Sequence, residues 1–127
     1  MAKETALEIW VGGGEDHEFV FDVTNVPETV AIDITGWALS FMVKRRVSDA
    51  DSAALVTKTT SSGIAIAGVF AAVITTNTQR ATVTIADSDV DDFVAGLMRW
   101  ELKRTGAGVE APLAYGPINF RRSVHKS

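Results

Sequence analysis

The residues of this chain that could do chemistry are few and lie far apart. Its two histidines, His17 and His125, fall near a strand end and near the end of the chain, where solvated surface histidines are the simpler interpretation. The internal serines Ser40, Ser52, Ser61, Ser62 and Ser88 show neither a nucleophile elbow nor a nearby histidine. The sequence has no cysteine, which excludes disulfides and thiolate metal sites. We therefore expect no catalytic residue and no enzyme.

Two acidic segments could in principle hold a metal ion. Residues 87–92 alternate acids in the manner of a calcium loop, but they lack the glycine and the terminal glutamate of an EF-hand. A short helical turn capped by Asp87 explains them better, because carboxylates suit the N-terminal end of a helix. Residues 15–17 form a weaker candidate that also fits a polar loop tip. We expect no metal and no cofactor.

Charge and hydropathy restrict the class of partner. Three glycines at residues 12–14 follow a strand pattern, but neither a Lys-Ser/Thr pair nor a helix signal follows, so a flexible turn fits better than a phosphate loop. The net charge of −4 argues against nucleic-acid binding. No apolar run approaches the roughly 20 residues that span a bilayer, and the first residues do not resemble a signal peptide. We expect a soluble protein made in a cytoplasm without classical export.

Alternating apolar and polar side chains predict β-strands along much of the chain. The alternation is clearest at residues 37–44, 80–86 and 96–105, where one face would lie in a core and the other in water. The longest run, 37–44, carries two large aromatic side chains on one face and should be a central strand, with Trp100 packed beside Trp37. The other inward positions of these runs are Leu39, Phe41, Val43, Ala81, Val83, Ile85, Met98 and Leu102.

Turn signals add further strands. Residues 5–11 and 17–23 should pair as a hairpin about the glycine-rich tip, and residues 96–105 and 110–122 as another. Residues 68–76 are apolar without clean alternation, which suits either a strand buried on both faces or one side of an interface.

These patterns predict an all-β, antiparallel, immunoglobulin-like β-sandwich of about seven to nine strands with one short helical turn. A chain of 127 residues is near the usual size of a single domain. We expect one domain over residues 1–127, with a core from about residue 5 to about residue 120 and a loose C-terminal tail at 121–127.

Four segments resemble a known family in their order and spacing. They are residues 33–44, residues 54–59 with Gly63 and Ile64, residues 81–105 and residues 113–120. Together they are similar to the small immunoglobulin-like domain at the N-terminus of tailed-phage baseplate upper proteins and in related tail-fibre or head-fibre proteins. In this comparison Asp33 and Thr35 would bond the turn before the long strand. Gly36 would lie where a bulge or a close neighbouring strand excludes a side chain.

The resemblance implies a structural virion protein of a bacteriophage tail, such as a baseplate or tail-fibre adaptor assembled in the host cytoplasm. Its partners would be other phage structural proteins, in a symmetric homo-oligomer, with neither nucleic acid nor membrane. The alternative is a head-surface fibre or decoration protein, or a carbohydrate-binding host-adhesion module that uses Trp10 and Tyr115 as exposed aromatics. A glycosidase would need paired carboxylates, and the spacing places no such pair.

One departure from the family points to an interface. Residues 65–79 add apolar residues that the family pattern lacks, and we interpret residues 69–74 as an added strand or docking element. A small basic cluster near the C-terminus could contact acidic neighbouring subunits, although solvated strand ends are a commoner explanation of such clusters. The candidate interface residues are Val69, Phe70, Val73, Ile74, Arg121 and Arg122.

Overall fold

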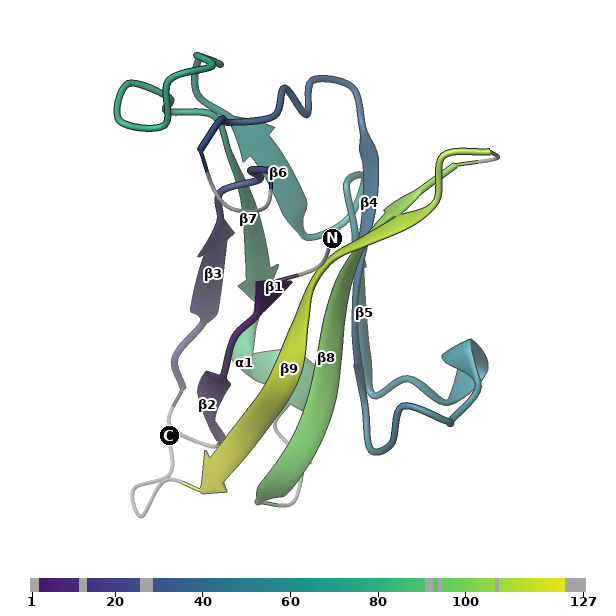
Figure 1. Ribbon diagram of the computed structural model, residues 1–127. Coiled ribbons are helices and arrows are strands. Elements are labelled where there is room, and N and C mark those ends of the chain that lie inside the picture. Colours follow the sequence, from purple (N-terminus) through teal and green to yellow (C-terminus); the bar gives the residue numbers. More distant parts are fainter. Residues whose placement is uncertain are drawn as a thin grey trace.

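Two β-sheets face each other in the computed structural model, which describes residues 3–11, 14–25, 29–90, 93, 95–106 and 108–122 (Figure 1). The larger sheet contains six described strands in the order β1-β9-β8-β4-β5, with β2 also paired to β9. Its strands are β1 (Lys3–Glu4), β2 (Leu7–Val11), β4 (Ala38–Lys44), β5 (Val56–Thr59), β8 (Gly96–Thr105) and β9 (Ala111–Arg122). The smaller sheet has the order β3-β7-β6 and consists of β3 (His17–Phe21), β7 (Arg80–Ile85) and β6 (Ile64–Ala67).

The predicted all-β sandwich with a short helical turn is confirmed. The described part of the chain holds nine strands, a four-residue helix α1 (Asp87–Val90) and a 3-10 turn η1 (Asp51–Ala53). Neither described helix is long or apolar enough to cross a membrane. The alternation of side chains is also as predicted, because the inward residues of β4, β7 and β8 form one buried cluster with those of β9.

The predicted hairpin between residues 5–11 and 17–23 is wrong. β2 lies in the larger sheet and pairs with β9 in parallel, with Leu7 opposite Ile118, whereas β3 pairs antiparallel with β7 in the smaller sheet. Both strands have one apolar face, and the chain crosses from one sheet to the other between them. Their apolar faces therefore meet across the core instead of lying side by side. The parallel ladders of β1 and β2 are also the exception to an otherwise antiparallel sandwich.

The aromatic centre of the core differs from the prediction. The rings nearest to Trp100 belong to Phe21 and Phe41, with centroids 5.4 and 5.7 Å away. The indole Nε1 of Trp100 donates to the backbone oxygen of Thr5, at 3.0 Å. Trp37 precedes β4 and lies at the end of the sandwich, half-buried, with the guanidinium of Arg104 3.9 Å from its ring centroid. It does not pack beside Trp100, because the register of β4 and β8 places Val43 opposite Trp100 and Ala38, the residue after Trp37, opposite Thr105.

Two expected turn roles are corrected. Asp89, and not Asp87, caps α1, because its Oδ2 accepts the hydrogen bond of the Ala86 backbone N–H at 2.8 Å. Asp87 instead joins the 14–16 segment, where its Oδ1 accepts from the Gly14 N–H. At Gly36 a side chain would meet nothing within 4 Å, and it is the φ of +76° that requires glycine there.

Residues 68–76 are not a strand. β6 ends at Ala67, and the next residue has a φ of +93° that turns the chain out of the sheet. The segment up to residue 79 then forms a loop that returns to β7, with β7 already paired to β3 and β6. A strand at 68–76 would have no free position beside β7. We call residues 68–79 the apex loop.

Candidate docking site

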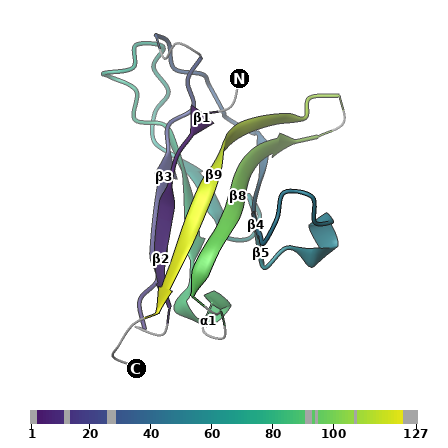
Figure 2. The same ribbon diagram turned by 60° about the horizontal axis from the view of Figure 1, so that its bottom comes forward.

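The apex loop exposes most of the apolar residues that the sequence singled out. It projects from one end of the sandwich, beyond the start of β7 (Figures 1 and 2). Val69 is 75% exposed and Val73 is 60% exposed, which is far more than a core strand would allow. Ile74 is exposed as well, and Phe70 is half-buried. The prediction of a buried strand here is therefore wrong, whereas the interface stays a prediction.

The base of the loop is closed by Thr78. Its backbone N–H donates to the oxygen of Val69 at 3.0 Å, and its hydroxyl oxygen accepts from the N–H of Val69 at 2.9 Å. Gly68 allows this approach, because a Cβ at this position would lie 1.9 Å from the Thr78 backbone oxygen. Its positive φ excludes other residues for a second reason.

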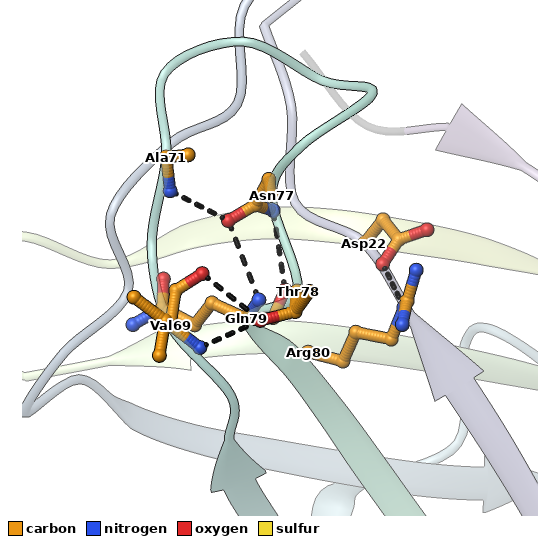
Figure 3. A network of polar contacts seen from close by, with 7 residues as sticks. All are labelled: Asp22, Val69, Ala71, Asn77, Thr78, Gln79 and Arg80. Carbon is orange, nitrogen blue, oxygen red and sulfur yellow. Dashed lines mark hydrogen bonds and ion pairs between the residues drawn. The ribbon is translucent and has the colours of Figure 1, made fainter.

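Buried amide side chains hold the interior of the loop (Figure 3). Asn77 is 8% exposed, and its Oδ1 accepts from the N–H of Ala71 at 3.0 Å and from that of Gln79 at 3.3 Å. Its Nδ2 donates to the oxygen of Gln79. A further backbone bond from Asn77 to Val73, at 3.0 Å, closes the tip. These contacts replace the ladder that a strand would have formed.

Gln79 fastens the loop to the turn before β4. Its side chain is buried, and its Oε1 accepts from the N–H of Ile34 at 2.9 Å. Its Nε2 donates to the hydroxyl of Thr35 at 2.9 Å and to Oδ1 of Asp33 at 3.2 Å. The predicted bond from Asp33 to the backbone of this turn is confirmed, because its Oδ1 accepts from the N–H of Thr35. The hydroxyl of Thr35 bonds the side chains of Asp33 and Gln79 instead of the backbone. Donation by Thr35 and then by Gln79 lowers the pKa of Asp33 below its usual value.

The neighbouring segment 29–31 extends the same end of the molecule. The N–H of Ala31 donates to the oxygen of Ala72 in the apex loop, at 2.9 Å. The preceding residue, Val30, is exposed. Asn25 in turn holds residues 29 and 30 through its side-chain oxygen. The apex thus combines exposed aliphatic side chains with a backbone held by hydrogen bonds.

The two basic candidates lie elsewhere. Arg121 and Arg122 end β9 at the opposite end of the sandwich from the apex loop (Figure 1). Arg121 forms an ion pair with Glu8, and its guanidinium lies 5.9 Å from the ring centroid of Trp10. Arg122 donates to the oxygen of Phe93 at 3.2 Å. The structure therefore brings the four apex candidates together and separates both arginines from them.

The acidic and histidine candidates have structural partners. Oδ2 of Asp89 lies 2.8 Å from Nζ of Lys58, whose hydrogen bond lowers the pKa of that carboxyl. A hydrogen bond of 3.2 Å joins Nε2 of His17 to the backbone oxygen of Trp10. The described residues contain no cluster of three or more possible metal ligands. Asp91, Asp92 and His125 lie outside the described residues.

Asn77 and Gln79 shape the candidate site, and sequence reasoning missed both of them. Their segment reads only as a turn between two runs, and the partners of both amides depend on the folded loop. Two amide side chains directly after an apolar run are the signal that could have indicated them. No family model matches the sequence, and no curated protein matches it significantly.

Proposed function

We propose that this chain is a non-catalytic structural protein of a tailed-phage virion that docks neighbouring subunits through the apex loop. The observation that carries the docking role is an exposed aliphatic surface on a loop with a hydrogen-bonded interior. Apolar side chains held out in water by such a scaffold are typical of an interaction site. The tail or baseplate location rests on the similarity of the strand and turn segments to the phage family.

The energetics favour this loop over a flexible one. Fully burying an exposed Val or Ile side chain contributes about 1.5–3 kcal/mol. A flexible loop would lose much of that gain in conformational entropy on binding, whereas the bonds of Asn77, Thr78 and Gln79 impose the order beforehand. In a symmetric assembly, several such contacts act together and the total attachment is stronger than one contact allows.

The proposal commits to a second copy of this chain as the occupant of the apex surface. The test is the mass of the purified chain in solution, measured by light scattering after size exclusion, for the wild type and for Val73→Asp. We expect a discrete oligomer such as a trimer or hexamer, which Val73→Asp dissociates because a carboxylate cannot be buried unpaired. Val47→Asp is the matched control, since Val47 is 76% exposed in the distant loop between β4 and β5.

Two results would contradict this function. A monomeric wild type at the highest concentration reached would exclude self-assembly through the loop. An oligomer that Val73→Asp leaves intact, or that Val47→Asp dissociates equally, would place the interface elsewhere. Thermal unfolding of each variant shows that the fold is retained.

A further inference from the structure

The outer face of the larger sheet carries a groove that the docking role does not use. The groove has a volume of about 420 Å³, within the range of small-molecule sites. Its walls come from the loop between β4 and β5, through Val47 and Asp51, and from the β8–β9 hairpin, through Thr105 and Glu110. Both connections extend beyond the body of the sandwich (Figures 1 and 2). None of the residues lining this groove belongs to the apex loop.

The floor is a row of side chains across three strands. Met42 of β4 lies opposite Glu101 of β8, which in turn lies opposite Tyr115 of β9. Ser40 and Lys103 form the next row, since they are also paired across β4 and β8. Tyr115 is 38% exposed, so a ring with an apolar face and a hydroxyl is presented to the groove.

The charges of the groove balance. Nζ of Lys44 lies 2.6 Å from Oδ1 of Asp51, and the Lys103 ammonium lies 3.8 Å from Oε2 of Glu110. Arg99 and Glu101 complete the set on the outward face of β8, and neither has an ion-pair partner among the described residues. Cations and carboxylates are thus equal in number. A groove without net charge does not favour a charged ligand of either sign.

We propose that this groove binds an uncharged oligosaccharide. A sugar ring has one apolar face, which can stack on Tyr115 and contact Met42. Its hydroxyls both donate and accept, so they can use the carboxylates as acceptors and the ammonium and guanidinium groups as donors. The Lys44 and Lys103 pairs hold these groups in place, which reduces the ordering that binding must impose. Hydrogen bonding by Lys44 also lowers the pKa of Asp51, which favours the carboxylate form that accepts hydrogen bonds.

The structure separates the two exposed aromatics that the sequence suggested for sugar binding. Trp10 lies on β2, opposite Arg121, and it does not line the groove. Tyr115 does line it. Substitution of Tyr115 therefore tests the groove, and substitution of Trp10 is the control. The proposal is independent of the docking function, because it depends on different residues on a different surface.

The experiment is binding of the labelled wild-type chain to an array of neutral and acidic glycans, followed by titration of a neutral hit into isotope-labelled protein. We expect binding to neutral glycans and shifts of the amide resonances of β4, β8 and β9. Tyr115→Ala should weaken the affinity about tenfold or more, which corresponds to about 1.4 kcal/mol. Tyr115→Phe should retain most of the affinity, because the ring remains, and Trp10→Ala should retain all of it.

Several outcomes would overturn the proposal. One is that folded wild-type protein binds no neutral glycan, and another is that it binds only acidic glycans. A third is that Trp10→Ala abolishes binding while Tyr115→Ala does not. Shifts of the groove resonances that follow protein concentration without sugar would identify a second copy of the chain as the occupant instead.

Discussion

The apex loop and the loop between β4 and β5 are stabilised by different kinds of hydrogen bond. Each leaves the sandwich and returns without strand pairing. In the apex loop, neutral amides buried to 92% or more, Asn77 and Gln79, bond to the backbone. In the β4–β5 loop, Lys44 donates to the oxygen of Asp49 at 3.0 Å and to the exposed carboxylate of Asp51. Buried neutral bonds are insensitive to salt, whereas exposed ion pairs are screened by it.

The difference also separates the surfaces that the two loops present. The apex loop keeps its polar groups inside and turns aliphatic side chains outward, which suits contact with another apolar surface. The β4–β5 loop keeps charges at its surface, where they become part of a polar groove. The two proposed roles, docking by the apex loop and ligand binding at the groove, thus rest on where each loop places its hydrogen bonds.

The largest effect should come from Gly68→Ala. The new Cβ would collide with the Thr78 backbone at the closed base of the apex loop and would also occupy a left-handed φ. We expect a loss of about 2–5 kcal/mol in the free energy of unfolding, measured by urea denaturation. Gly36→Ala is the control, because it has a similar φ of +76° with open space around it, and it should cost only about 1–2 kcal/mol. Equal losses would show that the base of the loop yields to the added atom.

The intermediate effect tests the comparison directly with a matched pair of substitutions. Gln79→Met keeps the length of the side chain but leaves the buried N–H of Ile34 without its acceptor, and we expect a loss of about 1–3 kcal/mol. Lys44→Met removes the ion pair of the β4–β5 loop and should cost about 0–1 kcal/mol.

The ionic strength should affect the stability losses of these two substitutions differently. High salt should shrink the effect of Lys44→Met and leave that of Gln79→Met unchanged, as measured by urea denaturation at low and high ionic strength. The comparison fails if Lys44→Met is as costly as Gln79→Met, or if salt changes both losses equally.

The smallest expected effect is on how the stability of the fold changes at acidic pH. The pKa of Asp33 is lower in the folded chain than in the unfolded one, because Thr35 and Gln79 donate to the carboxylate. The folded state therefore holds its proton less tightly. This contribution to stability is present above the unfolded pKa of about 3.9 and is lost as the pH falls through the folded value. We expect Asp33→Asn to flatten the fall in stability below about pH 4, measured by urea denaturation across that range.

The acid response has its own control. The pKa of Asp51 is also lowered, chiefly through its hydrogen bond from Lys44, so Asp51→Asn should flatten the same part of the curve in low salt but less in high salt. An unchanged acid slope in Asp33→Asn would show that folding does not lower the pKa of Asp33.

The faces of the strands could be predicted from the sequence, but their partners could not. Ala81, Val83 and Ile85 are buried as their alternation indicated, because the period of two is a local property of an extended chain. The pairing of β2 with β9 joins residues more than a hundred positions apart in the chain, with Leu7 opposite Ile118. No local pattern distinguishes this parallel partner from the nearby β3.

The candidate site shows the same limit. The apolar composition of residues 69–74 indicated an interface, but the same composition also suited a buried strand. The exposure of Val73 depends on Asn77 and Gln79 closing the loop behind it. The separation of Trp10 from Tyr115, which look equivalent in the sequence, likewise follows from which strands lie under the groove.

The sequence by itself determined the class of fold and which side of each long strand is buried, because these follow from alternation over neighbouring residues. It also determined that an unusual apolar segment lies between two strands. Only the tertiary structure decided which strands are neighbours, whether the apolar segment is inside or outside, and which polar residues meet at the groove. The physical reason is that burial and hydrogen bonding of a side chain depend on residues brought close by the whole fold, which local sequence does not specify.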